Sequence, residues 1–457
     1  MSDRPGDDRN HTGGRRGFEP APGCVLQAYV FVLDPGVEAE RALEMQCGAA
    51  RFAFNWALSR VKANQDQREA ERSYGITGTD LTPSASWSPY TLRKAFNQVK
   101  DQVAPWWREC SKEAYNTGFA GAATALRNWD DSRKGRRKGP RAGFPKFKTK
   151  RRTVPSCRFT TGTIRVEDRR HVTLPRVGTI RTHESTRKLD RRLVNGSARI
   201  LSATVSHRRG RWQVSFHCEV QRARREPARP DAVAGVDLGV AKWVVIADSE
   251  GHVRTIVGPR HLDYARHRLR RAGRTAARRR GPAVRDPATG TFVRRAPSRR
   301  WVKAQQKLGR IHLRVANLRR DAVHKLTTSL VREYGTVVVE DLNVAGMLRN
   351  RRLARRIADG SFGEIRRQLT YKTGWNGGTL VVADRWFPSS KLCSGCGAVK
   401  AKLSLHTRVH RCDECGLTLD RDVNAALNLA ALAGRMAGAG VAGHPGPQGP
   451  NARGASP

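Results

Sequence analysis

Acidic residues are scarce in this chain of 457 residues, where 40 Asp and Glu stand against 86 Lys and Arg and leave a formal net charge of +46. That balance argues against an ordinary metabolic enzyme or an acidic adaptor. It favours a polyanionic partner, because each phosphate that Lys or Arg neutralises releases condensed counterions. Long apolar runs are also missing, since none approaches the roughly 18 residues of a membrane-spanning helix. We therefore expect nucleic acid, and no membrane, as the partner.

A secretory signal is missing as well, because the first residues, MSDRPGDDRNHTGG, are polar and have no apolar core. The nine cysteines are few and unevenly placed. Four are bunched between residues 393 and 415, and five are scattered: Cys24, Cys47, Cys110, Cys157 and Cys218. We expect a reducing cytoplasm, with the scattered thiols as small buried hydrophobic groups and the bunched thiols as metal ligands.

The first half of the chain alternates strand and helix patterns. A β-like run covers 25–33, helical periodicity covers 37–62 and 89–129, and a hairpin pairs 200–207 with 212–220. These patterns predict a β-rich domain made of 23–35 and 153–230, with a helical insertion at 36–152. Residues 1–22 are polar and are expected to be disordered.

Between the helical and β-like parts lies Arg133–Arg152, which has eleven Lys or Arg and no acid. Its Gly143-Phe-Pro-Lys-Phe-Lys148 places aromatic rings between cations. A solvated basic linker is one interpretation. The interleaved aromatic residues favour a segment that holds a nucleic-acid backbone and stacks on its bases.

From residue 231 the pattern changes to strands separated by longer helices. Strands are predicted at 233–237, 242–248, 336–340 and 380–383, a long helix at 302–334 closed by Gly335, and a last helix at 423–432. The interval 266–303 has fourteen Lys or Arg, most of which should be exposed. Beyond Gly434 the chain is rich in Gly, Pro and Ala, so 435–457 is expected to be a flexible tail.

Three acids stand at the edges of these predicted elements. Asp237 ends a strand in Gly-Val-Asp-Leu-Gly, Glu340 ends another in Val-Val-Val-Glu-Asp-Leu-Asn, and Asp422 opens the last helix. Neighbouring carboxylates repel unless a hard cation neutralises them, and Mg²⁺ binds through a few carboxylates while keeping water. Two such ions can activate water and stabilise the leaving oxygen of a phosphodiester. One such acid alone is more often structural, but three in strand–strand–helix order in so basic a chain predict a catalytic magnesium site.

Two neighbouring acids complicate this assignment. Asp341 follows Glu340, and in an extended strand its side chain faces the other way. Asp420 precedes Asp422 by two residues and can cap the last helix. We assign Asp420 to capping and Asp422 to the metal, and leave open whether Asp420 shares the metal role.

The bunched cysteines form two pairs, Cys393-Ser-Gly-Cys396 and Cys412-Asp-Glu-Cys415, which are separated by fifteen residues and each followed by glycine. This spacing is typical of a zinc ribbon, in which two tight knuckles give four thiolates to one tetrahedral ion. Four thiolates leave no open position, so the zinc should be structural. His406 and His410 lie between the pairs, and we expect them at the surface or on nucleic acid rather than as ligands.

These residues resemble the TnpB family, the OrfB-type nucleases that bacterial transposons encode and that are related to type V CRISPR effectors. The likeness is specific over about 232–434 and thinner upstream, where it rests on Arg51-Phe-Ala-Phe-Asn55 and Gly143–Lys148. The specific part is carried by Gly-Val-Asp237-Leu-Gly, Val-Glu340-Asp-Leu-Asn, Phe387-Pro-Ser-Ser-Lys-Leu-Cys393-Ser-Gly-Cys-Gly and Cys415-Gly-Leu-Thr-Leu-Asp-Arg-Asp422-Val-Asn-Ala-Ala.

The resemblance implies a multidomain α/β protein. A RuvC nuclease domain of RNase H-like fold would cover 231–434, with a zinc ribbon inserted at about 386–419. The β-rich part would be a β-barrel wedge domain that carries 36–152 as a helical recognition insertion. The three acids would bind two catalytic Mg²⁺ ions, and one structural Zn²⁺ would be bound by Cys393, Cys396, Cys412 and Cys415.

The resemblance also implies an activity, which is RNA-guided cleavage of DNA by two-metal phosphodiester hydrolysis. The partners would be a guide RNA from the element's own transcript and double-stranded target DNA beside a short motif. The protein would act in the bacterial cytoplasm, associated with the nucleoid. Its oligomeric state stays open, with a monomer favoured.

Two alternatives remain. A single-strand transposase is not one of them. Its metal site needs two histidines two positions apart, and none of the thirteen histidines has this spacing. A strand-transfer transposase of RNase H-like fold could nevertheless use the same acids to activate a 3′-hydroxyl. A non-cleaving, RNA-guided DNA-binding repressor should have lost one of the acids, whereas all three are present.

Overall fold

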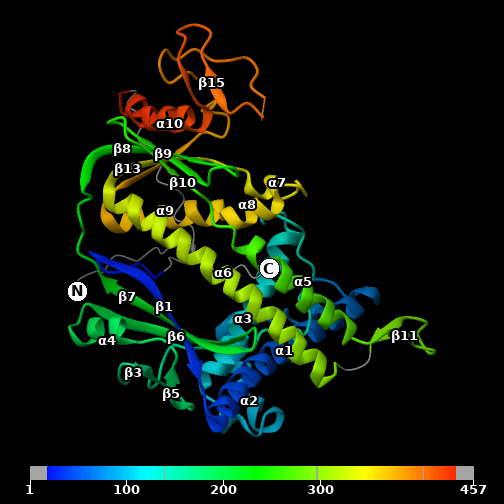
Figure 1. The fold of residues 1–457 in the computed structure, drawn as a ribbon. Helices are drawn as coiled ribbons and strands as arrows, with labels where there is room; N and C mark the ends of the chain where they lie inside the picture. Colours follow the sequence, from blue (N-terminus) through cyan, green and yellow to red (C-terminus); the bar gives the residue numbers. More distant parts are fainter. Residues whose placement is uncertain (1–17, 138, 295–296, 405, 439–457) are drawn as a thin grey trace, which may run out of the picture. The chain divides into compact units, whose positions relative to one another are not determined.

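The computed structural model describes residues 18–137, 139–294, 297–404 and 406–438, and the chain divides into two compact units. One unit is Pro20–Arg222, and the other comprises the described residues from 223 onward together with residues 18 and 19. Each combines helices with β-sheet (Figure 1). No described helix is long and apolar enough to cross a bilayer.

The sheet of Pro20–Arg222 has seven strands in the order β2-β6-β7-β1-β5-β4-β3. Strand β1 pairs with β7 along Cys24–Val32 and with β5 at Leu33 and Asp34, so it joins two parts of the sheet. Strands β2 and β3 stand at opposite ends of this order, so barrel closure stays a prediction, whereas the hairpin β6–β7 is confirmed. The bounds are β1 Cys24–Asp34, β2 Ser156–Phe159, β3 Arg165–Val166, β4 His171–Leu174, β5 Gly178–Thr182, α4 Arg187–Val194, β6 Ala198–Arg208 and β7 Arg211–Gln221.

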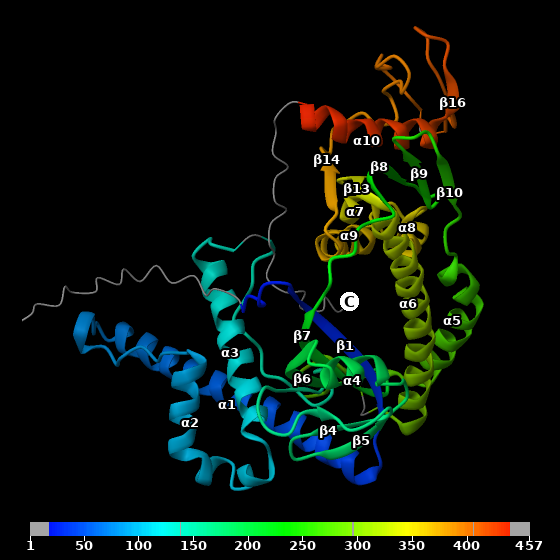
Figure 2. The same cartoon turned by 90° about the vertical axis from the view of Figure 1, so that its left-hand side faces the viewer.

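Three longer helices belong to the same unit: α1 Val37–Ser73, α2 Pro89–Val103 and α3 Lys112–Arg133. Helices α1 and α3 pack side by side (Figure 2). They approach closely because Gly118 lies against the backbone of α1, where an added Cβ would stand 2.4 Å from the Ala50 carbonyl oxygen. The predicted helix at 37–62 therefore exists but is longer, and the predicted region 89–129 is two helices.

The basic segment 133–152, which was predicted to hold nucleic acid, contacts α1 and α3 through Phe144 and Lys148. Asn55 of α1 donates from Nδ2 to the Lys148 carbonyl oxygen at 2.9 Å and accepts the Lys148 N–H at 2.8 Å. The Lys148 ammonium lies 3.8 Å from the centre of the Phe54 ring, and burial lowers the pKa of this amine. Phe144 packs edge-on against Trp129. Of the two aromatic residues in the motif, Phe144 is half-buried and Phe147 is 51% exposed, so Phe147 presents the more open ring.

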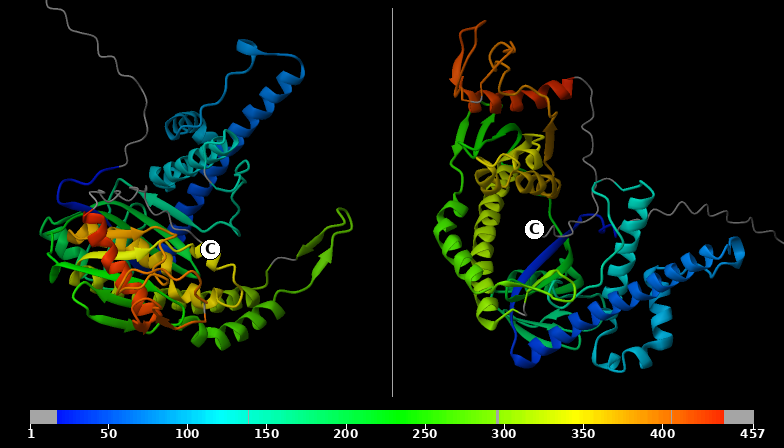
Figure 3. Two further views of the ribbon diagram at one scale, coloured as in Figure 1. Left: turned by 90° about the horizontal axis from the view of Figure 1, so that it is seen from above. Right: turned by 90° about the vertical axis from the view of Figure 1, so that its right-hand side faces the viewer.

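The sheet of the second unit has five strands in the order β10-β9-β8-β13-β14. Strands β8, β13 and β14 are parallel, whereas β9 pairs antiparallel with β8 and β10 pairs antiparallel with β9. Helices α6 and α9 cover one face and α10 covers the other (Figure 3). The bounds are β8 Arg229–Leu238, β9 Val244–Asp248, β10 Val253–Ile256, α6 Arg299–Glu333, β13 Tyr334–Glu340, α9 Phe362–Asn376, β14 Thr379–Ala383 and α10 Arg421–Gly438.

Alternation along β13 explains why both faces are covered. Val337 and Val339 lie in the core beneath α6 and α9, whereas Val338 lies in the core beneath α10. A strand buried on both faces reads as a continuous β-branched run. The smaller elements of this unit are α5 His261–Arg278, β11 Ala283–Arg285, β12 Phe292–Arg294, α7 Val344–Met347, α8 Ala354–Gly360, β15 Val409–Arg411 and β16 Thr418–Asp420.

Two glycines allow backbones to meet in this unit. A Cβ at Gly235 of β8 would stand 2.0 Å from the Ala426 carbonyl oxygen, so α10 lies directly on the strand. A Cβ at Gly335 would stand 1.7 Å from the Pro230 carbonyl oxygen. Gly335 therefore lets β13 pass close to the backbone of β8. The prediction that Gly335 closes the long helix is wrong. Helix α6 ends at Glu333 and the strand starts at Tyr334.

The two predicted terminal regions lie mostly outside the described residues, which leave out 1–17 and 439–457. Helix α10 runs to Gly438, so 435–438 are helical rather than part of the predicted tail. Four of the scattered cysteines are buried as predicted, and Cys24 is half-buried. The arginines of α5 are mostly exposed, also as predicted, because the helix buries only Ala272 and Ala276.

Candidate functional site

Asp237, Glu340 and Asp422 come together where the parallel strands end. Asp237 lies one residue before the end of β8 and Glu340 is the last residue of β13, and the pairing of Val236 with Val339 places the two acids side by side. Asp422 is in the first turn of α10, which lies on β8. Burial, and then the charges of Glu340 and Asp422, raise the pKa of Asp237 to about 8. The three acids are therefore within electrostatic range of one another.

Ser389 holds the Glu340 carboxylate. Its buried hydroxyl donates to Glu340 Oε1 at 2.5 Å. Ser389 follows β14, and the parallel pairing of β14 with β13 brings this loop to the end of the strand that carries Glu340. The sequence motif Phe387-Pro-Ser-Ser supported the family resemblance, but sequence reasoning missed the role of Ser389. The signal in the sequence was the hydroxyl of Ser389, which comes shortly after the strand predicted at 380–383. That strand could run parallel to the strand that ends at Glu340.

The neighbouring acids have other partners. Burial raises the pKa of Asp341, but hydrogen bonds from Arg366 and, at 2.6 Å, from Arg385 outweigh it and leave the pKa low. Asp420 Oδ1 accepts the N–H groups of Asp422 at 3.0 Å and of the next residue at 3.2 Å, which confirms that Asp420 caps α10. Its other oxygen pairs with Lys242 at 2.6 Å and so joins the β8–β9 hairpin tip to the start of α10.

The chemistry of the three acids suits a hard divalent cation. Asp237 is held at a raised pKa partly by the other two carboxylates, and a cation would relieve this repulsion. Among the described residues, the cysteine quartet is the one group of three or more such side chains that is placed to hold an ion. The three acids fit Mg²⁺ by the type of their donor atoms.

The four bunched cysteines form one closed cluster of sulfurs. All four Sγ atoms lie within 4.8 Å of one another, with Cys393–Cys415 at 3.6 Å and Cys396–Cys412 at 3.5 Å. Four thiolates about 2.3 Å from one tetrahedral ion have this spacing, so these residues fit zinc. Gly397 and Gly416 follow the pairs with φ of 81° and 71°, the left-handed backbone that each knuckle requires.

Two buried asparagines of α10 fasten the first knuckle to that helix. Asn424 Nδ2 donates to the Leu392 carbonyl oxygen at 2.7 Å, and its Oδ1 accepts the Ser394 N–H at 2.9 Å. Asn428, one turn later, donates to the Leu392 carbonyl at 2.7 Å and to the Ser389 carbonyl at 2.9 Å. Residues 389–394 thus connect the cysteine cluster, the partner of Glu340 and the helix of Asp422.

His410 is buried, so the expectation of a surface or nucleic-acid contact is wrong for this residue. It lies in β15 with 0% exposure, and neither ring nitrogen has a hydrogen-bond partner among the described residues. Alternation along the strand turns the ring inward between exposed Val409 and Arg411. His406 is exposed, as expected.

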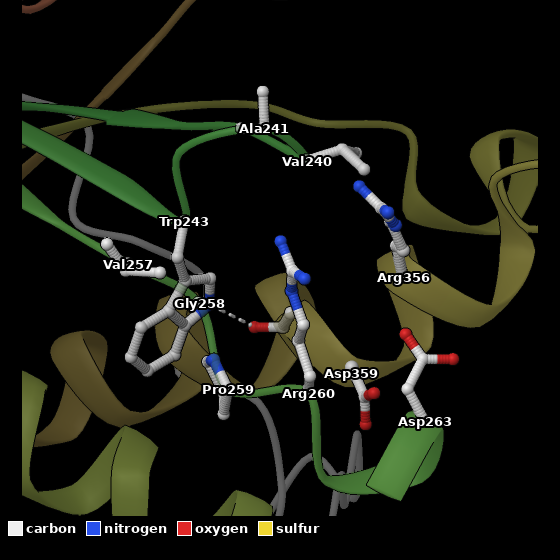
Figure 4. A pocket seen from close by; sticks show the side chains of 12 residues that line it. Val240, Ala241, Trp243, Val257, Gly258, Pro259, Arg260, Asp263, Arg356 and Asp359 are labelled. Carbon is white, nitrogen blue, oxygen red and sulfur yellow. Dashed lines mark hydrogen bonds between the residues drawn. The ribbon is translucent and has the colours of Figure 1, made fainter. Parts of the chain in front are cut away.

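A pocket opens beside the hairpin tip that follows Asp237, and Figure 4 shows the side chains of Arg260 and Arg356 in its wall. The Trp243 indole also lines this pocket, and its N–H donates to the Gly360 carbonyl oxygen at 2.8 Å. An adjoining hollow shares Arg356 and is also lined by Arg266, Arg352 and Arg355.

The two acids that line this pocket are already paired. Asp263 binds Arg355 at 2.9 Å, and Asp359 binds Arg319 at 2.6 Å. These pairs leave the positive charge of Arg260 and Arg356 without an ion-pair partner among the described residues. The pocket is therefore suited to an anion beside the acid site.

Comparison with known proteins brings these features into one family. The model described as "Probable transposase" (OrfB_IS605) matches 215–351, the "Cas12f1-like, TNB domain" matches 362–429, and a "Helix-turn-helix domain" matches 25–70. A Mycobacterium tuberculosis (strain H37Rv) protein named as an RNA-guided DNA endonuclease is 43% identical over 424 residues, which are 89% of this chain and 86% of the relative. The chain belongs to the TnpB family.

A more distant relative aligns with a similar share of the chain. InsQ of Escherichia coli (strain K12), also named as an RNA-guided DNA endonuclease, is 30% identical over 423 residues, 89% of this chain and 92% of the relative. Among solved structures, a chain of a Cas12f1–sgRNA–target DNA complex aligns at 13% identity and a TM-score of 0.45, covering 89% of this chain and 99% of that chain.

In this TnpB-family chain, one of the matched segments agrees with the local structure and another does not. The TNB match runs from α9 to α10 and includes all four cysteines. The segment matched as helix-turn-helix is instead a strand, β1, followed by most of one continuous helix, α1. That description therefore does not fit the local structure here.

Proposed function

We propose that this protein is an RNA-guided DNA endonuclease that cleaves target DNA by phosphodiester hydrolysis at Asp237, Glu340 and Asp422. The observation that carries the proposal is the meeting of these three acids at one edge of the sheet. Two relatives that are named RNA-guided DNA endonucleases, and that align with 89% of the chain, support it. The partners would be a guide RNA from the element's own transcript and double-stranded DNA beside a short motif.

We infer the domains from the same observations. Residues 231–434 would be a RuvC domain of RNase H-like fold, a reading supported by the order β10-β9-β8-β13-β14 with acids at the ends of β8 and β13. A zinc ribbon would occupy about 386–419. The strands within 23–35 and 153–230 would be the wedge domain, and the helices within 36–152 the recognition insertion.

In the mechanism, the three acids would hold Mg²⁺, which when bound activates water and stabilises the leaving oxygen. The protein's own groups prepare this site. Ser389 fixes the orientation of Glu340, and the Lys242–Asp420 pair keeps the hairpin after Asp237 against the start of α10. Arg260 and Arg356 would hold a backbone phosphate next to the acids. The four thiolates would hold one Zn²⁺, which is structural because no position is left open.

Specificity would come from base pairing rather than from side chains. In such a nuclease the guide pairs with the target strand, and the protein holds the heteroduplex through its backbone. A net charge of +46 suits that task, because contacts between arginine or lysine and phosphate are independent of sequence.

The test is a programmed cleavage assay. The protein is expressed with its native flanking DNA, and the RNA that purifies with it is sequenced; we expect one discrete RNA that ends in a segment copied from the edge of the locus. With Mg²⁺ and a matched target, the wild-type protein should cut and Asp237→Ala should not, although Asp237→Ala still binds RNA and target. Asp231→Ala changes an exposed acid at the other end of the same strand and should cut normally.

Four results would contradict the proposal. Heterogeneous RNA that high salt removes would show a general polyanion contact instead of a guide. Cleavage that persists in Asp237→Ala would place the chemistry elsewhere. Covalent joining of DNA ends would indicate the strand-transfer alternative, and a bound target that stays uncut with Mg²⁺ would indicate a repressor.

A further inference from the structure

Trp386 is the exposed member of the ten tryptophans, all of which lie in the described ranges. Nine are buried or half-buried, whereas Trp386 is 85% exposed. A single exposed apolar side chain is ordinary on a protein surface, so exposure alone does not indicate a role. Two further features distinguish this indole: a fixed turn carries it, and that turn lies near the proposed catalytic acids.

The turn that carries Trp386 is anchored on both sides. Asp384 Oδ1 accepts the Trp386 N–H at 2.8 Å, and the Asp384 carbonyl oxygen accepts the Phe387 N–H at 3.1 Å. Arg385 pairs with Asp341 at 2.6 Å, and Phe387 packs on the core that Val338 and Leu429 form beneath α10. The backbone is therefore fixed, and the indole is directed away from it into solvent.

This turn lies beside the proposed catalytic acids. Asp341, the partner of Arg385, directly follows Glu340, and Ser389 binds Glu340 only three residues after Trp386. Three residues of extended chain span at most about 11 Å. The turn also follows β14, at the same edge of the sheet where β8 and β13 bring their acids, which is where ligands of such sheets bind.

We propose that Trp386 is a stacking platform for a nucleobase of the DNA strand being cut, a few nucleotides from the scissile phosphate. This inference rests on the proposed nuclease function. An indole stacks on any base, because every base has a π-face, and it therefore holds a single strand without reading its sequence. That property suits a site where the guide supplies the sequence specificity. The stacked base would fix the position of the strand relative to Glu340.

The experiment combines variants with an abasic scan. Guide-matched DNA is prepared with one abasic nucleotide at successive positions around the cut, and kcat/KM is measured for the wild-type protein, Trp386→Ala and Trp386→Phe. We expect one position at which loss of the base slows the wild-type protein about tenfold, a typical worth for one stacked base. On intact DNA, Trp386→Ala should be slowed by a similar factor and should no longer respond to that abasic site.

The controls separate stacking from folding and from the nuclease activity itself. Trp386→Phe keeps a ring and should retain most of the rate, and Phe292→Ala, which removes a ring that is 74% exposed in the β11–β12 hairpin, should cut normally. Melting temperatures should be unchanged in all variants, because the side chains are exposed. If Trp386→Ala cuts intact DNA like the wild-type protein, or keeps the same abasic response, the platform is refuted while the nuclease stands. If the wild-type protein cuts no guide-matched DNA, both fall.

Discussion

Two aspartates in adjacent strands have opposite electrostatic environments. Burial raises the pKa of Asp248, but the Arg229 guanidinium and the N–H groups of His252 and Glu250 outweigh it and bring the pKa to about 2. For Asp237, burial and the neighbouring carboxylates act in the same direction and bring the pKa to about 8. Asp248 therefore stabilises the fold, whereas Asp237 is kept where its charge is unfavourable. Such an arrangement is typical of a functional acid.

We predict that Asp248→Asn lowers the free energy of unfolding by about 3 kcal/mol, because it leaves Arg229 without its buried partner. The folded-state pKa lies below the unfolded value of about 3.9, so this stabilisation is complete above that value and is lost as the pH falls from about 4 to 2. Urea unfolding at about pH 6 and about pH 2.5 should therefore show a smaller difference between the two proteins at the lower pH. Asp321→Asn, which breaks an exposed pair with Lys325, should have no measurable effect at either pH. A difference independent of pH would contradict the assignment.

Single residues differ in how far the sequence could predict them. Glu340 could be found because it ends a β-branched run that reads as a buried strand, and Asp237 because it ends the strand predicted at 233–237. The ends of two such strands can share an edge of a sheet. Ser389 could not be found, because its contact with Glu340 depends on which strand β14 joins, and pairing between distant strands is not encoded locally. His410 was misjudged for a related reason: the three-residue strand β15 is too short to show an alternating pattern that would turn the ring inward.

For helices and strands, the kind of element was predicted better than the residue at which it ends. Four of the five strands of the second sheet and its last helix were predicted from their patterns, whereas β10 was missed and α6 was closed one residue late at Gly335. Glycine there was read as a helix terminator, whereas its actual task is to let β13 pass the Pro230 carbonyl. A close approach of two backbones is marked in the sequence only by a glycine. Glycine also occurs in turns and at helix ends, so the residue type alone does not distinguish these roles. Barrel closure in the first unit stays a prediction from the family resemblance, because it depends on which strand edges meet and no local pattern encodes that.

The segment 389–394 joins three elements, and this connection predicts coupling between them. Asn428→Ala removes the side-chain donor to the Ser389 carbonyl and one of the two side-chain donors to the Leu392 carbonyl, which should cost about 1–3 kcal/mol. Cys396→Ser removes one of the four thiolates that are proposed to hold zinc, and should lower Tm further. The double variant should lose less than the sum of the two losses, because both act through the same loop. Thermal melts of the four proteins measure this. As a control, Asp321→Asn should combine additively with Cys396→Ser, and additivity in the Asn428 cycle would contradict the coupling.

For the molecule as a whole, charge is the property that the sequence established most directly. Carboxylates of the second unit are used in ion pairs, as Asp263, Asp341, Asp359 and Asp420 show. The cations far outnumber them, and α5 carries its arginines on an exposed surface. A chain of charge +46 without its polyanion should therefore repel itself, and the same chain with nucleic acid bound should be held together by the opposite charge.

These two states should respond to salt with opposite signs. In the RNA-free protein, raising NaCl from about 0.1 M to about 0.5 M shortens the screening length and weakens repulsion between like charges, so Tm should rise. In the RNA-bound protein, the same change should lower Tm, because salt opposes the release of counterions and RNA binding contributes less to stability. Differential scanning fluorimetry of both forms across this range makes the comparison, with magnesium held constant. A Tm that rises with salt in both forms would mean that bound RNA adds little to stability. A Tm that falls in both would mean that attractive ion pairs such as Arg229–Asp248 outweigh the repulsion of the excess arginines.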